Sequence, residues 1–334
     1  MQEASFYCFH DLALEVREES GGVGNQLPVL LEGLSWNRTS RFVDRPNLRI
    51  CVSHSENGFK IPSTGYERFY AEGFSGVESG DDFYLTGDSS FFHLQPARGQ
   101  GYARLASSFF SKPALIQRNF WSFGLLMLLR PLGIFSLHAA GVAQKGCGLL
   151  IIGASGSGKS TLSIGLIRAG WSYLSDDALL LRSTPNGVEA LALRKSFYIE
   201  AVRSLDYSDL RPNEEVPDTK GGRKCRICIE ETYPEQYLQR CIPRLIVLPR
   251  IIPQKRSKLA TMDHVLALKI LLAESGPQLF DKKTMPRHLE LLNKLLQQGA
   301  VYELEAGIDL YHDPTKLIRL IEKARGKSIE ADYG

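Results

Sequence analysis

The sequence predicts an α/β protein with a β-rich amino-terminal domain over residues 1–110 and a larger α/β domain over residues 134–330. Three observations predict this fold class. Short apolar and aromatic runs separated by turn residues fill the first part of the chain, as in antiparallel strands. A continuous apolar run at residues 148–152 precedes a glycine-rich turn and a helical segment. The carboxy-terminal part has apolar residues at helical spacing, which predicts a helical layer on a sheet.

Length and composition are those of a globular protein with two domains. The chain has 334 residues, of which 43% are hydrophobic and 23% are charged, and a domain commonly holds about 100–200 residues. Lys and Arg number 40 against 37 Asp and Glu, and a net charge of +3 gives no sequence-wide basic footprint. We therefore expect no nucleic-acid partner. The six cysteines are too scattered for a disulfide-rich secreted domain, which favours a cytoplasmic location.

No segment of the sequence is predicted to enter a membrane. The most apolar run, residues 120–129, is interrupted by Arg130 and Pro131, whereas a helix that crosses a bilayer needs about 20 apolar residues. The amino terminus lacks a positively charged leader and an apolar stretch of signal-peptide length. We expect no membrane partner, and we interpret residues 120–129 as part of a buried helix.

In the amino-terminal domain, aromatic runs alternate with turns. Residues 83–85 and 91–94 are apolar and aromatic, and the Gly-Asp-Ser sequence at residues 87–89 is typical of the turn between two strands. Residues 115–130 then show a helical pattern that ends before a proline. This helix forms the centre of a predicted connector over residues 111–133.

The second domain begins with strands and ends with helices. Residues 134–142 and 148–152 predict two strands, and the continuous apolar run of the second is typical of a strand buried on both faces. A helix over residues 160–169 follows. Later strands are predicted at residues 171–174, 178–182, 188–193, 226–230 and 245–248. Helices that pack on the sheet are predicted at residues 263–274, 284–298 and 313–324.

Residues 153–160 carry a phosphate-binding pattern. They read Gly-Ala-Ser-Gly-Ser-Gly-Lys-Ser, which matches G-x-x-x-x-G-K-[ST] at every fixed position between a predicted strand and a predicted helix. The glycines let backbone N–H groups turn toward a phosphate, Lys159 can reach the β and γ phosphates, and Ser160 can hold Mg²⁺. The pattern predicts ATP and Mg²⁺ as cofactors. The residues expected to bind the nucleotide are Gly153, Ala154, Ser155, Gly156, Ser157, Gly158, Lys159, Ser160 and Thr161.

Two adjacent carboxylates follow the next predicted strand. Asp176 and Asp177 come just after residues 171–174, a strand that we expect to neighbour the strand before the phosphate-binding loop. A hydroxyl acceptor needs a carboxylate that orients it and takes its proton, whereas Mg²⁺ needs hard oxygen ligands. Two aspartates can divide these roles, so the pair indicates phosphoryl transfer. The alternative is a solvated turn.

His138 precedes the loop in the segment Leu-His-Ala-Ala-Gly at residues 137–141. A lone histidine in an apolar context is more often a core residue than a catalytic one. The nearby aspartate pair makes a catalytic partnership with His138 worth proposing.

Together, His138, residues 153–161 and the Asp176-Asp177 pair resemble the carboxy-terminal catalytic domain of bacterial HPr kinase/phosphorylase. The resemblance covers residues 134–182 and includes a helix that ends near a glycine before the aspartate pair. It implies a divergent P-loop kinase core of the HPr-kinase/PEP-carboxykinase-like type, to which the residue patterns add a β-rich amino-terminal domain and a helical carboxy-terminal layer. The implied activity is that of an HPr-kinase-related serine kinase.

The resemblance also implies a role for each site residue. Asp176 is expected to act as the general base, and His138 is expected to donate a hydrogen bond that orients it. The implied catalytic residues are Asp176, His138 and Lys159. The implied Mg²⁺ ligands are Ser160, Asp177 and Glu200.

The acceptor implied by the resemblance is a Ser or Thr hydroxyl of a protein or peptide, and the family's closed oligomers imply a homo-oligomer. Two alternatives stay open. In the first, the protein is a kinase that phosphorylates a small metabolite, since PEP-carboxykinase-like enzymes share related loop and metal chemistry. In the second, the protein is a non-catalytic module in which bound ATP shifts the conformation that a partner recognises.

Overall fold

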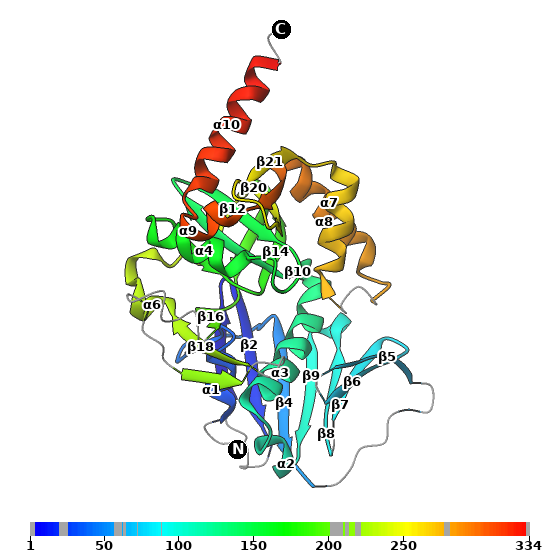
Figure 1. Ribbon diagram of the computed structural model, residues 1–334. Coiled ribbons are helices and arrows are strands. Elements are labelled where there is room, and N and C mark those ends of the chain that lie inside the picture. The colour runs from blue at the N-terminus through cyan, green and yellow to red at the C-terminus, as the bar shows by residue number, and fades with distance from the viewer. Residues whose placement is uncertain are drawn as a thin grey trace. The chain divides into compact units, whose positions relative to one another are not determined.

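The protein is a mixed α/β molecule whose strands form four sheets in the described part of the chain (Figure 1). The computed structural model describes residues 4–19, 26–56, 62, 65–71, 73–87, 89–200, 210, 214–217, 222–276 and 281–331. The chain divides into two compact units. Unit 1 comprises Met1–Phe135 with Phe280–Met285, and unit 2 comprises Ser136–Leu279 with Pro286–Gly334.

A nine-stranded sheet forms unit 1. Its strands are β1 (Ala4–Phe9), β2 (Leu12–Glu18), β3 (Asn37–Thr39), β4 (Leu48–His54), β5 (Tyr66–Ala71), β6 (Phe74–Ser79), β7 (Asp82–Gly87), β8 (Ser90–Gln95) and β9 (Gln100–Leu105). They lie in the order β3-β1-β2-β4-β9-β8-β7-β6-β5. The β2–β4 and β4–β9 pairs are parallel. The predictions of a β-rich amino-terminal region and of strands at residues 83–85 and 91–94 are confirmed.

One helix packs buried aromatic side chains against the sheet of unit 1. The helices of this unit are α1 (Gln26–Glu32), η1 (Pro96–Arg98), α2 (Ser107–Phe110), α3 (Ala114–Leu129) and η2 (Arg130–Leu132). On α3, which confirms the helix predicted at residues 115–130, the Trp121 ring lies 5.0 Å from the ring of Phe92 on β8. A Cβ on Gly124 would lie 2.3 Å from the same Phe92 ring, so the glycine permits this close approach of helix and sheet.

A six-stranded sheet forms the centre of unit 2. Its strands are β11 (Ala139–Gln144), β12 (Cys147–Ile152), β13 (Ser172–Ser175), β20 (Pro243–Ile251), β21 (Lys258–Thr261) and β22 (Ala300–Ala306). They lie in the order β13-β11-β12-β20-β22-β21. β12 confirms the predicted buried strand, because residues 148–152 are all buried. The strand before the aspartate pair, β13, does not neighbour β12 as predicted, since β11 lies between them.

The strand directions bring three distant segments to one edge of this sheet. Both β12 and β13 run antiparallel to β11, so their carboxyl ends lie where β11 begins. In register, Ala139 pairs with Ile152, and Gly141 pairs with Ser175. The residue before β11, the loop after β12 and the residues after β13 therefore meet at the same edge.

Two smaller sheets complete the β structure of the described chain. One contains β10 (Ile134–Leu137), β14 (Leu179–Thr184), β15 (Gly187–Ala192) and β19 (Arg240–Cys241), in the order β10-β14-β15-β19. The other contains β16 (Ser196–Glu200), β17 (Glu214–Pro217) and β18 (Arg223–Cys228), in the order β16-β18-β17.

The carboxy-terminal part of the chain contains strands as well as helices. The helices after β12 are α4 (Lys159–Arg168), α6 (Ile229–Thr232), η3 (Pro234–Gln236), α7 (His264–Ala273), α8 (Met285–Gln298), α9 (Ile308–His312) and α10 (Lys316–Ala331). The prediction of a helical carboxy-terminal layer missed β21 and β22, which extend the central sheet beside β20. Among the described residues, no helix combines the length and the apolar character that a bilayer crossing needs.

Candidate functional site

The loop between β12 and α4 has the backbone of a phosphate cradle. Gly156 and Gly158 adopt φ angles of 88° and 96°, a left-handed conformation that strains residues with a side chain. Gly158 is followed directly by α4, which starts at Lys159 and spans ten residues. The free N–H groups and the positive dipole end of this helix are therefore directed at the loop, which favours a bound phosphate group.

Lys159 folds back over this loop. Its Nζ atom donates to the backbone oxygens of Gly153, at 2.6 Å, and Ala154, at 3.1 Å. The residue is only 6% exposed, and burial lowers the pKa of its amine. Because a buried ammonium group needs an anionic partner, a negatively charged ligand at the loop would satisfy it better than two carbonyls do.

Asp176 faces the loop from the end of β13. The residue is 3% exposed, and its Oδ2 atom accepts a hydrogen bond from the Ser160 hydroxyl at 2.9 Å. Its Oδ1 atom is buried and has no hydrogen-bond partner among the described residues. A buried carboxylate oxygen without a partner is costly, so this atom is available for a ligand that the loop brings in.

The burial of Asp176 predicts a pH-dependent stability. Burial, together with the charge of Asp177, raises the pKa of Asp176 from 3.8 to about 6, although Ser160 and Lys159 oppose the shift. Between these values the folded state binds the proton more tightly than the unfolded state, so the free energy of unfolding falls as pH rises. We expect Asp176→Asn, which removes the buried charge, to stabilise the nucleotide-free protein by about 1–3 kcal/mol near neutral pH.

Thermal unfolding of wild type and Asp176→Asn checks this expectation. The stabilisation is expected near pH 7.5 and should disappear below about pH 3, where the wild-type carboxyl is protonated in both the folded and the unfolded state. A difference in unfolding midpoint that does not change with pH would contradict the role of the buried charge.

Asp177 points away from the loop into a separate network. Its Oδ1 atom lies 3.0 Å from Nε2 of His138, and its Oδ2 atom accepts a hydrogen bond from Nη1 of Arg194 at 3.0 Å. Its side chain is 55% exposed. Desolvation opposes ionisation, but the hydrogen bond with His138 and the charge of Arg194 lower the pKa of Asp177 well below its usual value. This carboxylate is ionised and accessible.

His138 sits between two carboxylates. Its Nδ1 atom lies 2.6 Å from Oε2 of Glu274, while Nε2 faces Asp177. The hydrogen bond with Asp177 raises the pKa of His138, while burial acts in the opposite direction. An ionised carboxylate only accepts hydrogen bonds, so protons on both ring nitrogens satisfy both contacts.

The pairing of these residues differs from the sequence-based expectation. His138 was expected to orient Asp176 and Ser160 was expected to share a metal with Asp177, but the hydrogen bonds join His138 to Asp177 and Ser160 to Asp176. The physical reason is the turn after β13, where Asp177 adopts a left-handed φ of 65° and directs its side chain away from that of Asp176. The expected metal ligand Glu200 ends β16, and its side chain lies outside the described residues.

Two residues of the network were missed by sequence reasoning. Arg194 lies two residues beyond β15, and Glu274 follows the last residue of α7. Neither occurs in a motif, and no spacing rule connects Glu274 with His138, which is 136 residues away. The only local signal was the helix predicted at residues 263–274, which places Glu274 at its end.

The residues at the loop fit a Mg²⁺–nucleotide complex. The Ser160 hydroxyl and the Asp176 carboxylate are hard oxygen donors held 2.9 Å apart, and the unpartnered oxygens of Asp176 and Ser157 lie beside the same loop. Within the described ranges, no three or more His, Cys, Asp or Glu side chains form a metal cluster. This donor set suits Mg²⁺, which commonly binds one or two protein oxygens and takes its other ligands from phosphates and water.

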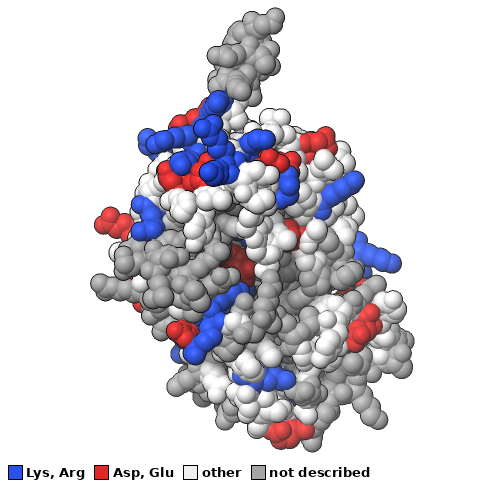
Figure 2. Space-filling model, viewed as in Figure 1, with Lys and Arg blue, Asp and Glu red and all other residues white. Residues whose placement is uncertain are grey.

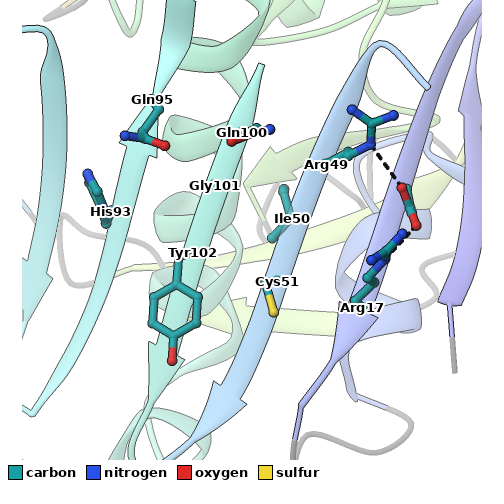
Figure 3. Close-up of a pocket in the computed structure, with 10 residues that line it drawn as sticks. Arg17, Arg49, Ile50, Cys51, His93, Gln95, Gln100, Gly101 and Tyr102 are labelled. Carbon is teal, nitrogen blue, oxygen red and sulfur yellow. Dashed lines mark hydrogen bonds and ion pairs between the residues drawn. The ribbon is translucent and has the colours of Figure 1, made fainter. Parts of the chain in front are cut away.

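A cavity of about 440 Å³ opens on the sheet of unit 1, between side chains of β2, β4, β8 and β9 (Figure 3). In its wall, Glu15 is 5% exposed and accepts hydrogen bonds from Nε of Arg17, at 2.6 Å, and Nε of Arg49, at 3.1 Å. Burial and Glu19 raise the pKa of the Cys51 thiol to about 12, so this thiol is a poor nucleophile. The described residues that line this cavity do not include a phosphate-binding loop or an aspartate pair like Asp176 and Asp177.

Charged side chains of both signs occur together on the surface near α9 and α10 (Figure 2). On β20, Arg250 lies 2.6 Å from Glu305 and 3.7 Å from Glu303, both of which are on β22. These acidic partners reduce the field of Arg250.

Comparison with known proteins gives a distant relationship. Over 95 residues the chain is 31% identical to an HPr kinase/phosphorylase of Chlorobium chlorochromatii (strain CaD3), and the match covers 28% of this chain. The chain thus spans 28% of the length of that curated relative. The solved structure of the Hpr(Ser) kinase/phosphatase from Coxiella burnetii matches with a TM-score of 0.30 and 15% identity, covering 58% of this chain and 97% of that chain. No protein-family model matches the chain.

Proposed function

We propose that the protein transfers the γ-phosphoryl group of ATP to a hydroxyl, and that the acceptor is a Ser or Thr of a protein or peptide. The observation that carries the proposal is the division of the aspartate pair. Asp176 is buried against Ser160 of the phosphate-binding loop, whereas Asp177 is exposed and contacts His138. One carboxylate thus belongs to the nucleotide side of the site and the other to the acceptor side.

On the nucleotide side, the loop after β12 binds and orients the triphosphate. The backbone N–H groups and Lys159 hold the β and γ phosphates, and Ser160 with Asp176 would hold Mg²⁺. When bound, Mg²⁺ supplies positive charge that offsets the negative charge of the transferring group. Asp176, at 3% exposure, is too enclosed to meet an acceptor hydroxyl.

On the acceptor side, Asp177 orients the hydroxyl and receives its proton. The general base expected from the sequence, Asp176, is replaced in this proposal by Asp177 because only the second carboxylate is accessible. Its lowered pKa fits a loose phosphoryl-transfer transition state, in which the proton leaves late and alignment contributes more than basicity. His138 holds one oxygen of Asp177 in place.

The test is transfer of label from γ-labelled ATP in the presence of Mg²⁺, with lysate of the native host as the source of acceptors. Label that appears on a protein or peptide as acid-stable phosphoserine or phosphothreonine is the expected result. Label only on a small molecule would replace the proposed acceptor with a metabolite. Bound ATP without any transfer would overturn the kinase proposal in favour of a nucleotide-dependent interaction module.

A further inference from the structure

Glu274 occupies an electrostatically unfavourable position. It caps the carboxyl end of α7, where its N–H donates to the backbone oxygen of Ile270 at 2.9 Å and no basic residue lies in the last helical turn. A carboxylate at a helix carboxyl end faces the negative end of the helix dipole. The Glu274 side chain is also only 13% exposed. A positively charged partner must compensate for both effects.

That partner is His138, which Glu274 contacts twice. The His138 backbone N–H donates to the backbone oxygen of Glu274 at 2.8 Å, and Nδ1 lies 2.6 Å from Oε2. The two contacts hold both the backbone and the ring of His138. Nδ1 of the ring is thus engaged by the Glu274 carboxylate, and Nε2 is directed at Asp177.

We infer that Glu274 is a positioning residue that acts through His138 to hold Asp177 in the orientation needed for phosphoryl transfer. The inference rests on the proposed function, because Asp177 is the residue that meets the acceptor there. Arg194 holds the second oxygen of Asp177 at 3.0 Å, so the carboxylate is held from two sides, by Glu274 through His138 and by Arg194 directly. Supporting partners of a reactive group commonly change a rate by about tenfold to a hundredfold.

A double-mutant cycle tests this inference. Glu274→Ala is expected to lower kcat by about tenfold to a hundredfold with the KM for ATP unchanged, because the loop after β12 is intact. His138→Gln should have a similar effect, and the double variant should be no slower than His138→Gln alone, since the Glu274 side chain contacts the ring of His138. Additive losses, or wild-type kcat in Glu274→Ala, would overturn the inference.

Glu189→Gln is the matched control. Its side chain is also 13% exposed and accepts a hydrogen bond from Nε of Arg182 at 2.8 Å, but it belongs to a different network of unit 2. Glu274→Gln keeps the size of the side chain and removes its charge, and it should lose activity where Glu189→Gln does not. Equal kcat values for these two variants would count against a specific role of Glu274.

A spectroscopic measurement separates failure of the inference from failure of the proposed function. In the ¹⁵N spectrum of the nucleotide-free protein, both His138 ring nitrogens are expected to show protonated shifts near neutral pH. Glu274→Gln should shift the Nδ1 resonance, and Glu189→Gln should leave it unchanged. An unchanged resonance in Glu274→Gln would overturn the inference even if the wild type transferred phosphate. A shifted resonance in a protein without transfer would refute only the kinase function.

Discussion

Asp177→Asn is expected to lower the rate of phosphoryl transfer by about 10²–10⁴-fold, the contribution typical of a positioned acid–base residue. The amide oxygen of Asn can still accept a hydrogen bond from His138 or Arg194, so the local fold is retained. The neutral amide, however, neither aligns an acceptor hydroxyl as a carboxylate does nor takes its proton. Nucleotide affinity should stay within about threefold of wild type, because the Ser160 hydroxyl of the phosphate-binding loop donates to Asp176 and not to Asp177.

Single-turnover transfer and equilibrium ATP binding, measured on the same preparation, check both halves of this expectation. Asp263→Asn is the control for the chemical change, because Asp263 caps α7 and Asn is an equally good capping residue. Retention of more than a tenth of the wild-type rate in Asp177→Asn would show that another group receives the proton.

Lys159→Met is expected to weaken ATP binding by about tenfold to a hundredfold, the range for losing a charge-assisted hydrogen bond. Methionine keeps most of the apolar stem of Lys159, which is buried, but removes the donor that reaches Gly153 and Ala154. Transfer at saturating ATP should fall further, because the lost charge also stabilises the transferring group.

Isothermal titration with ATP and Mg²⁺ measures the affinity. Lys195→Met is the matched control, since Lys195 pairs with Glu230 at 3.1 Å and is not part of the loop after β12. An unchanged affinity in Lys159→Met would mean that the loop does not bind the triphosphate in the proposed way.

The local elements of unit 2 could be predicted because their signals are contained in short segments. The buried strand over residues 148–152, the glycine-rich loop and the helix after it each depend on neighbouring residues only. Strands β21 and β22 were missed because apolar residues at helical spacing dominate the sequence of the carboxy-terminal part. The position of β11 between β12 and β13 depends on strand pairing, which no short segment records.

The division of labour between the two aspartates could not be predicted, because it is set by one turn. Adjacent residues after a strand can face opposite sides, and which one faces the loop depends on the turn that follows. Two hydrogen bonds close the turn. The Ala178 N–H donates to the backbone oxygen of Asp176 at 2.8 Å, and the Ser175 hydroxyl donates to the backbone oxygen of Ala178 at 2.5 Å. With Asp177 at positive φ, the first carboxylate faces Ser160 and the second faces outward.

The third carboxylate of the site illustrates a different limit. Glu274 approaches His138 through tertiary packing of α7, and a sequence carries no signal for a contact between residues 136 positions apart. Motif reasoning locates the residues that bind ligands, since these occur at short spacings. The residues that support them come from elsewhere in the chain and are seen only in the fold.

The most direct test of the central claim compares Asp176→Asn with Asp177→Asn in two assays, the Mg²⁺ dependence of ATP affinity and the single-turnover rate of transfer. The account predicts that Asp176→Asn loses the gain in affinity that Mg²⁺ provides, because its carboxylate faces Ser160. Asp177→Asn should keep that gain and lose transfer at saturating nucleotide. The opposite assignment, in which Asp177→Asn loses the Mg²⁺ effect and Asp176→Asn keeps it, would contradict the account.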